Sequence, residues 1–330
     1  MKKLINDPFD FVDEMLEGFL MAHADQVRRV GRRAVARLDA PVMGKVGVVI
    51  GGGSGHLPAF MGYVGKGSAD AAPVGNIFAS PPAKPVLEAT RAANGGVGVV
   101  YSYGNYAGDV MNFDRAAELA WLEGIEVRTV LVTDDVASAP QAELHRRRGI
   151  AGDFFVFKAL AAKAETMADL GAVVRAGEKA NANTRTMGVA LSACTVPANG
   201  KPTFSLGADE MEIGLGIHGE PGLRRARIEP VDRIVEEMFA ALEADLGFAG
   251  EDVAVLVNGL GATPPEELYL IYRHLARLMQ DRRMTTRQLY IGEYVTSLEM
   301  AGASVTLMRL DAELLELVKM PAECPMFSQR

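Results

Sequence analysis

Cysteine is scarce in this sequence, and no hydrophobic run approaches the length of a membrane span. Cys194 and Cys324 are the only two cysteines among 330 residues, and they lie far apart without metal-ligand spacing. The five histidines include no HxxxH pair, so we expect no structural zinc site and no other bound metal. So few cysteines are typical of proteins that work in a reducing compartment, and we expect a cytoplasmic protein.

Basic charge is also in short supply, and the N-terminal segment lacks the pattern of a signal peptide. The net charge of −8 provides no general attraction to nucleic acids or to anionic membranes. Residues 1–11 contain two lysines but no apolar core. We therefore expect neither a nucleic acid nor a membrane as a partner of this chain.

The hydrophobic fraction of 49% is that of a globular protein, and the length suits one large or two medium domains. Short β-branched runs predict strands at 45–50, 97–103 and 127–133, and the residues between them predict helices at 82–93 and 109–122. Strands that alternate with helices are typical of a parallel sheet with both faces covered.

The second half of the chain continues in the same way. An alanine-rich stretch at 154–181 predicts a helix that bridges two halves, and an earlier helix is predicted to begin at Asp7-Pro8. We expect an α/β fold of two domains, with mainly parallel or mixed sheets covered by helices. The boundary is placed near residue 185, which gives an N-terminal domain with glycine-rich loops (1–185) and a C-terminal domain with a histidine turn (186–330).

Polar residues gather in the loops that follow the predicted strands. In an open parallel sheet, ligands bind beyond the carboxyl ends of the strands. The loops that stand out are GGGSGH at 51–56, GNYAGD at 104–109, the segment Thr133-Asp134-Asp135, and the turn GIHGEPG at 216–222.

The glycine loop at 51–56 does not match the known nucleotide-binding patterns. His56 stands where a GxGxxG pattern needs glycine, and Pro58 stands there if the pattern starts two residues later. Gly67 follows Gly65-Lys66, where a Walker A loop needs serine or threonine. A nucleotide-dependent oxidoreductase is therefore disfavoured. The glycines instead let backbone N–H groups approach a small polar ligand.

Three titratable residues in these loops are candidates for chemistry. His56 and His218 are both flanked by glycine, which leaves little local packing for an imidazole that can act as base, acid or nucleophile. Asp109 begins a predicted helix, and it is either an N-cap or a positioned carboxylate.

Six motifs in this chain together resemble the ketose-binding K subunits of the dihydroxyacetone kinase family, in order and spacing along essentially the whole chain. They are GGGSGH (51–56), GNIFASPPA (75–83), GNYAGDVMNF (104–113), GIHGEPG (216–222), NGLGATP (258–264) and TSLEMAGASVTL (296–307).

The resemblance implies roles for particular residues. His218 would bind the substrate carbonyl covalently as a hemiaminal, Asp109 would be the base for phosphoryl transfer, and His56 would assist the acid–base steps. The residues implied to position the ketose are Gly53, Ser54, Gly55, Ser80, Gly104 and Asn105.

The resemblance also implies partners. The K subunits pair as homodimers and bind no nucleotide themselves. ATP or ADP and magnesium would therefore be held by a separate L-type subunit. In some members a phosphocarrier protein recharges the nucleotide on that subunit. Some relatives instead act as non-catalytic, ketose-sensing coactivators of a transcriptional regulator. Because both His56 and Asp109 accompany His218 here, the sequence favours the kinase subunit.

Two positions depart from the members that are specific for dihydroxyacetone. The resemblance would lead us to expect lysine at Gly104 and glutamate at Leu57, and both differences remove polar groups. The surrounding motifs look more like members that act on erythrulose or on branched ketoses.

Overall fold

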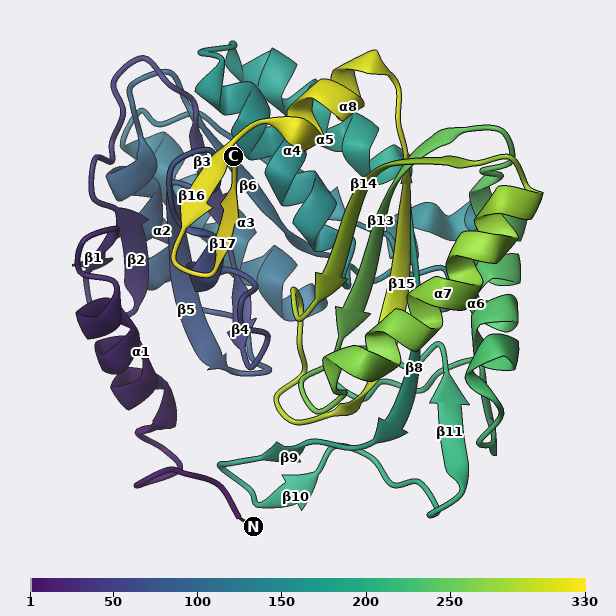
Figure 1. Cartoon of the computed structure of the whole chain (residues 1–330). Coiled ribbons are helices and arrows are strands. Elements are labelled where there is room, and N and C mark those ends of the chain that lie inside the picture. The colour runs from purple at the N-terminus through teal and green to yellow at the C-terminus, as the bar shows by residue number, and fades with distance from the viewer. Residues whose placement is uncertain (1) are drawn as a thin grey trace.

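A computed structural model describes residues 2–330 and shows a mixed α/β fold built on two sheets (Figure 1). The first sheet has, in spatial order, β1 (Val27–Val30), β2 (Ala34–Arg37), β5 (Ala71–Ile77), β3 (Gly47–Ile50), β6 (Val99–Gly104) and β7 (Val127–Val132), with β4 (Gly52–Ser54) paired to β5. The strands β5, β3, β6 and β7 run parallel, whereas β1 and β2 add an antiparallel edge.

The second sheet is mixed and mostly antiparallel. Its order is β12 (Arg224–Arg227), β11 (Glu210–Ile213), β8 (Thr184–Ser192), β15 (Ala301–Arg309), β13 (Asp252–Gly259) and β14 (Thr285–Gly292). Only the β13–β14 pair is parallel within it. The simple alternation of strand and helix predicted for the first half therefore does not extend to the second sheet.

Helices cover the outer face of each sheet. Helices α2 (Ala83–Ala93) and α3 (Ala107–Leu122) pack on the first sheet, and α6 (Val231–Leu246) and α7 (Pro265–Asp281) pack on the second. Successive strand residues serve opposite faces, as the two-residue period of a strand requires: Val49 packs on the α2–α3 side, and Val48 and Ile50 pack on the other.

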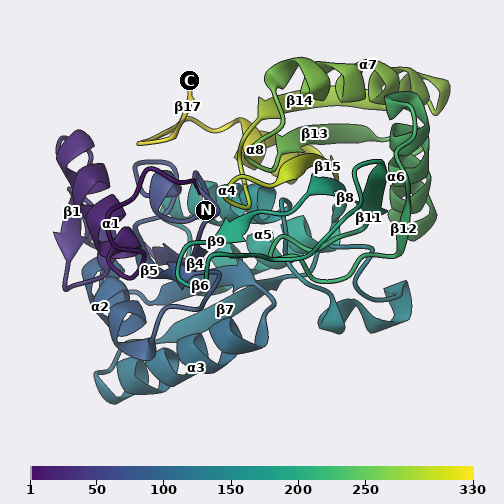
Figure 2. The same ribbon diagram turned by 90° about the horizontal axis from the view of Figure 1, so that it is seen from below.

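The layer between the two sheets is helical (Figure 2). It contains α4 (Asp153–Glu165) and α5 (Leu170–Ala182), and α8 (Ala312–Lys319) packs on α4. Helix α4 is buried on nearly all sides rather than along one stripe, because both sheets contribute to the core around it. One cluster of buried side chains thus joins Val100 of the first sheet, Leu160 of α4 and Leu256 of the second sheet.

Two predicted helix boundaries were wrong. The long helix expected at 154–181 is broken after Glu165, and α5 starts afresh where the Asp169 carboxylate accepts the Ala172 N–H at 2.8 Å. The first helix, α1 (Phe11–Ala22), begins later than expected, because the Asp7 side chain instead accepts the N–H of Phe9 in a turn.

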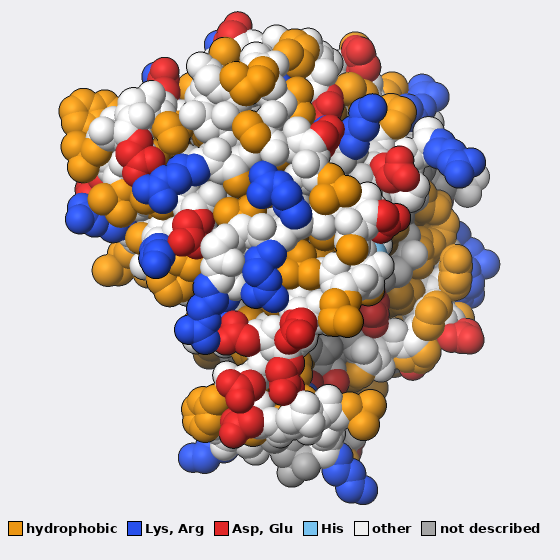
Figure 3. Space-filling model, turned by 90° about the vertical axis from the view of Figure 1, so that its left-hand side faces the viewer, with side chains coloured by type: hydrophobic (Ala, Val, Ile, Leu, Met, Phe, Trp, Pro, Cys, Tyr) orange, Lys and Arg blue, Asp and Glu red, His pale blue; other side chains and the backbone are white. Residues whose placement is uncertain are grey.

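The remaining elements are short: 3₁₀ turns at Met61–Tyr63 and Gln141–Arg146, and the hairpins β9 (Thr195–Val196) with β10 (Lys201–Pro202) and β16 (Ala322–Cys324) with β17 (Phe327–Gln329). The face that carries α1 and β1 mixes Lys and Arg with Asp and Glu side chains (Figure 3). None of the helices within residues 2–330 is both long and apolar enough to cross a membrane. The domain boundary at 185 stays a prediction.

Candidate functional site

The site forms where loops from the two sheets meet. His56 follows β3 and β4, and Asp109 lies in the first turn of α3, just beyond the carboxyl end of β6. His218 lies in the turn between β11 and β12. The structure thus brings together the three residues singled out from the sequence around one cavity.

The cavity itself is small, about 20 Å³, which is room for about one water molecule. Entry of a larger ligand therefore requires side chains to move apart. It is lined by Gly51, Gly52, Gly53, His56, Phe60, Gly104, Tyr106, Asp109, Gly149, Asp153, Ile217 and His218.

The His56 imidazole is buried and its two nitrogens are both engaged. Its Nδ1 lies 2.7 Å from the Thr296 carbonyl oxygen, so Nδ1 carries a hydrogen and donates it. Its Nε2 lies 3.1 Å from Nε2 of His218. Burial, together with the neighbouring charge of His218, lowers the pKa of His56 to about 3, so this ring is neutral at pH 7.

The other nitrogen of His218 is held by a carboxylate. Its Nδ1 lies 2.9 Å from Oε1 of Glu220, while Oε2 of Glu220 accepts the His218 backbone N–H at 3.0 Å. Burial acts to raise the pKa of Glu220, but the hydrogen bond and charge of His218 together with the charge of Arg148 outweigh it and lower the pKa to about 2. Glu220 is therefore ionised and must receive a hydrogen from Nδ1 of His218.

These contacts determine where the protons lie. Because Nδ1 of each ring donates to an oxygen, the two facing Nε2 atoms hold one hydrogen between them when they are 3.1 Å apart. Burial keeps His56 neutral, and the carboxylate of Glu220 is ionised beside His218. The pair can pass one proton between two nitrogens that line the cavity.

Asp109 is the third residue of α3 and not its N-cap, which is Tyr106, and no capping hydrogen bond from a side chain is formed. Its Oδ1 is buried without a hydrogen-bond partner among residues 2–330. Burial raises the pKa of Asp109 to about 6, against the lowering effects of the Ser80 hydroxyl and of His218. Ser80 itself makes only a long, 3.4 Å bond to the Pro81 carbonyl, so its hydroxyl remains available to the carboxylate.

The other residues implied by the resemblance divide into two groups. Gly53 and Gly104 line the cavity, and a Cβ on Gly53 would lie 2.6 Å from the backbone nitrogen of Ala79, so glycine is required there. Asn105 does not line the cavity, because its amide donates to the carbonyls of His145 and Arg147 at 2.9 and 2.8 Å. It holds the loop before α4 in place.

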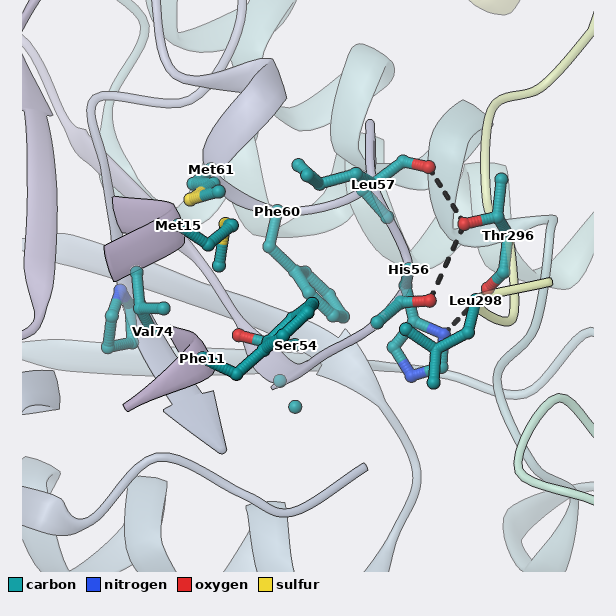
Figure 4. Close-up of a pocket in the computed structure, with 15 residues that line it drawn as sticks. Phe11, Met15, Ser54, His56, Leu57, Phe60, Met61, Val74, Thr296 and Leu298 are labelled. Carbon is teal, nitrogen blue, oxygen red and sulfur yellow. Dashed lines mark hydrogen bonds between the residues drawn. The ribbon is translucent and has the colours of Figure 1, made fainter. Parts of the chain in front are cut away.

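Ser54 and Gly55 face a second, neighbouring cavity of about 210 Å³ (Figure 4). That cavity is mainly apolar, with Phe11 and Met15 of α1 on one side, and it shares His56 and Phe60 with the site. The Ser54 hydroxyl is bonded to the Gly75 carbonyl at 2.7 Å.

Comparison with known proteins decides the family. The Dak1 domain model matches residues 17–326. The chain belongs to the Dak1 family. It is 47% identical over 330 residues to the dihydroxyacetone-binding subunit DhaK of the PTS-dependent dihydroxyacetone kinase 2 of Listeria innocua, covering 99% of both chains. It is also 47% identical to the D-erythrulose kinase of Mycolicibacterium smegmatis, matching all of this chain but only 57% of that longer relative.

Among solved structures, the dihydroxyacetone kinase operon co-activator Dha-DhaQ superposes with a TM-score of 0.90 at 32% identity, covering 96% of this chain and 98% of that one. The Dak1 fold is therefore shared by chains named as kinases, as kinase subunits and as a co-activator. The fold alone does not select among these functions, so the side chains of the site must do so.

The structure of this Dak1 chain also shows site residues that the sequence reasoning missed. Glu220 orients His218, and Tyr106 and Asp153 present buried oxygens at the cavity. Glu220 and Tyr106 lie within motifs already noticed but were not singled out there, whereas Asp153 lies in none of these motifs and directly precedes the helix predicted at 154–181.

The segment 296–298 was likewise noticed only as a motif. Its backbone joins the two histidine loops: the N–H of Leu298 donates to the Gly55 carbonyl at 2.8 Å, and the Ser297 hydroxyl donates to the Ile217 carbonyl. This segment fixes the spacing of the two imidazoles, although they lie 162 positions apart in the chain.

Proposed function

We propose that this chain is the ketose-binding subunit of a dihydroxyacetone-type kinase that works in the cytoplasm. It binds a short-chain ketose, such as dihydroxyacetone or erythrulose, covalently at His218 and presents a terminal hydroxyl for phosphorylation. The observation that carries this proposal is the pair of facing imidazoles that shares one proton beside an ionised Glu220.

The two imidazoles supply both the nucleophile and the acid for the addition of a nitrogen to a ketone. When the shared proton moves to Nε2 of His56, the lone pair of His218 Nε2 is free to attack the carbonyl carbon. The C–N bond forms as the carbonyl π pair moves to oxygen, which takes the proton from His56. His218 then carries a positive charge with its hydrogen on Nδ1, where Glu220 stabilises it.

Asp109 is suited to be the general base for the transfer step. With a pKa of about 6 it is mostly ionised at pH 7, and it is basic enough to accept a proton from a hydroxyl as that hydroxyl attacks phosphorus. Covalent capture fixes the hydroxyl in place, and phosphoryl transfer depends chiefly on such positioning.

The phosphate donor belongs to a partner in this proposal. The glycine loop offers no nucleotide-binding pattern, so a separate L-type subunit holds ATP or ADP with magnesium, and a phosphocarrier protein is a further source of phosphate. Two copies of this chain form the homodimer to which that subunit docks.

The test combines binding and turnover. The purified chain is mixed with a ketose labelled with ¹³C at the carbonyl, and we expect the carbonyl carbon signal to be replaced by that of a tetrahedral carbon. With the L-type subunit and ATP, the same ketose is phosphorylated. His218→Ala abolishes both signals, whereas the matched control His274→Ala retains them, because His274 pairs with Glu236 away from the site. A carbonyl signal that persists in the bound wild-type complex refutes covalent capture.

A second candidate is a ketose-sensing coactivator, which the superposition on the co-activator favours. Such a protein needs ketose capture by His218 but has no use for a base with the raised pKa of Asp109. If Asp109→Asn abolishes phosphorylation while ketose capture persists, the kinase function holds. If the wild-type chain captures ketose but supports no phosphorylation with any L-type subunit, the coactivator function replaces it.

A further inference from the structure

Three buried oxygen atoms at the site lack a hydrogen-bond partner among residues 2–330. They are the Tyr106 hydroxyl, Oδ1 of Asp109 and Oδ1 of Asp153, and all three residues line the same cavity as His218. Leaving such groups buried and unpaired is costly, so clusters of them mark places where a polar ligand completes the bonding. Asp109 has a use in the proposed reaction, but Asp153 has none.

The Asp153 carboxyl group sits in an environment that disfavours a negative charge. It is 2% exposed at the start of α4, and burial together with the like charges of Asp134 and Asp109 raises its pKa well above the usual range. No Lys or Arg is among the described residues that line the cavity. The group is therefore a neutral carboxylic acid, which can both donate and accept a hydrogen bond.

The neighbouring Asp134 shows what a structural buried aspartate looks like in this fold. Its two oxygens accept the backbone N–H groups of Ile150 and Gly152 at 2.8 and 2.7 Å, which ties the loop before α4 to β7. Asp153 has no comparable partner for Oδ1. The contrast separates a carboxyl group that holds the fold from one that is left free beside the cavity.

Gly149 leaves room beside the Asp153 carboxyl group. A Cβ on Gly149 would lie 2.9 Å from Oδ1 of Asp153 and 2.5 Å from the Cα of Gly104. Any side chain at position 149 would therefore push against both the carboxyl group and the backbone of β6. The bare backbone of Gly149 leaves the acid facing the cavity that all three residues line.

We propose that Asp153 is a specificity-determining residue, which binds a ketose hydroxyl beyond the two that dihydroxyacetone offers. This inference rests on the proposed function, since it assumes a ketose held at His218. With the carbonyl at His218, the hydroxyls of a three-carbon ketose can satisfy two of the three unpaired groups. A four-carbon ketose brings a third hydroxyl, and the neutral acid of Asp153 both donates to it and accepts from it.

The experiment compares ligands that differ by that one hydroxyl. Binding to the full chain is measured by titration calorimetry for dihydroxyacetone, for both enantiomers of erythrulose, and for 1,3-dihydroxybutan-2-one, which has four carbons but lacks the terminal hydroxyl. We expect at least one erythrulose enantiomer to bind about tenfold more tightly than 1,3-dihydroxybutan-2-one, because a site built for a hydroxyl rejects analogues without it.

Variants of Asp153 identify the group that recognises the hydroxyl. Asp153→Leu, of similar size but apolar, should bind erythrulose and 1,3-dihydroxybutan-2-one equally, whereas Asp153→Asn, neutral like the acid, should keep most of the preference. Asp153→Ala replaces the leucine variant if that variant does not fold. Asp134→Asn is the matched control, which should lower the unfolding temperature without changing the preference.

The outcomes are distinct. If the preference is the same in the wild type and in Asp153→Leu or Asp153→Ala, the inference is wrong, and Asp153 serves only to hold a water molecule or the fold. If the wild type binds all the ketoses without preference, the inference also fails, while the proposed function stands. If the wild type binds none of them, the proposed function itself fails.

Discussion

Replacing Glu220 with glutamine removes the charge that stabilises a cation on His218 while keeping an oxygen at hydrogen-bond distance. The pKa of Glu220 falls from 4.5 to about 2, which corresponds to roughly 3 kcal/mol of favourable interaction. Arg148, whose guanidinium lies 3.9 Å from Glu220, shares in this energy. Assigning about half of it to His218 leaves roughly 1.5 kcal/mol, or about tenfold in a binding constant.

The effect of Glu220→Gln should therefore appear in ketose binding. In the proposed reaction, covalent capture leaves a positive charge on His218 beside Glu220, and without the carboxylate the adduct loses this stabilisation. We expect the variant to bind dihydroxyacetone about tenfold more weakly than the wild type. Titration calorimetry measures this directly.

The matched control is Glu236→Gln, which removes the carboxylate 3.2 Å from His274 on the outer helices and should leave ketose binding unchanged. Equal affinities of Glu220→Gln and the wild type for dihydroxyacetone would refute the stabilisation of the adduct by Glu220.

Three further predictions concern other groups of the site. Turnover with the L-type subunit should fall about tenfold between pH 7 and pH 5, because Asp109 takes up a proton with a pKa of about 6. Asp109→Asn should lose on the order of a hundredfold in turnover while it retains ketose binding, and its turnover should not change between these pH values. The pKa of His56 is lowered from 6.5 to about 3, so between these pH values this histidine is protonated in the unfolded chain and neutral in the folded one. Urea unfolding should therefore show a loss of about 2 kcal/mol in stability from pH 7 to pH 5, and a smaller loss in His56→Gln. Gly149→Ala should weaken ketose binding at least about tenfold and lower the stability by roughly 1–3 kcal/mol, because the alanine Cβ would meet the backbone of Gly104. Binding and unfolding curves equal to those of the wild type would contradict this.

Much of the fold could be predicted because its main elements are local in origin. The β-branched run at 45–50 and the alternation up to residue 133 gave strands and helices close to the observed ones. The edge strands β1 and β2 were missed, since their four-residue spans contain arginine and carry no clear alternation. Their pairing with β5 depends on contacts that a local pattern does not contain.

The main residues of the site could be predicted from the sequence, but the contacts between them could not. Glycine-flanked histidines and a helix-start aspartate pointed to His56, His218 and Asp109, and the structure places these three around one cavity. The sequence does not reveal that Nε2 of His56 faces Nε2 of His218, because that contact arises from the packing of two separate halves. Asp153 was invisible for a related reason: an aspartate at a helix start is ordinary, and only its burial without a partner makes it unusual.

Helix α4 has a consequence for how the molecule moves. Because α4 packs on β3 and β6 of the first sheet while its Phe154 and Phe155 contact Tyr290 of the second, separating the two halves would expose this apolar contact to water. Hinge opening of the kind seen in two-lobed binding proteins is therefore too costly here. Ligand exchange must proceed through local displacement of the loops around His56 and His218, and the chain should melt in a single cooperative transition.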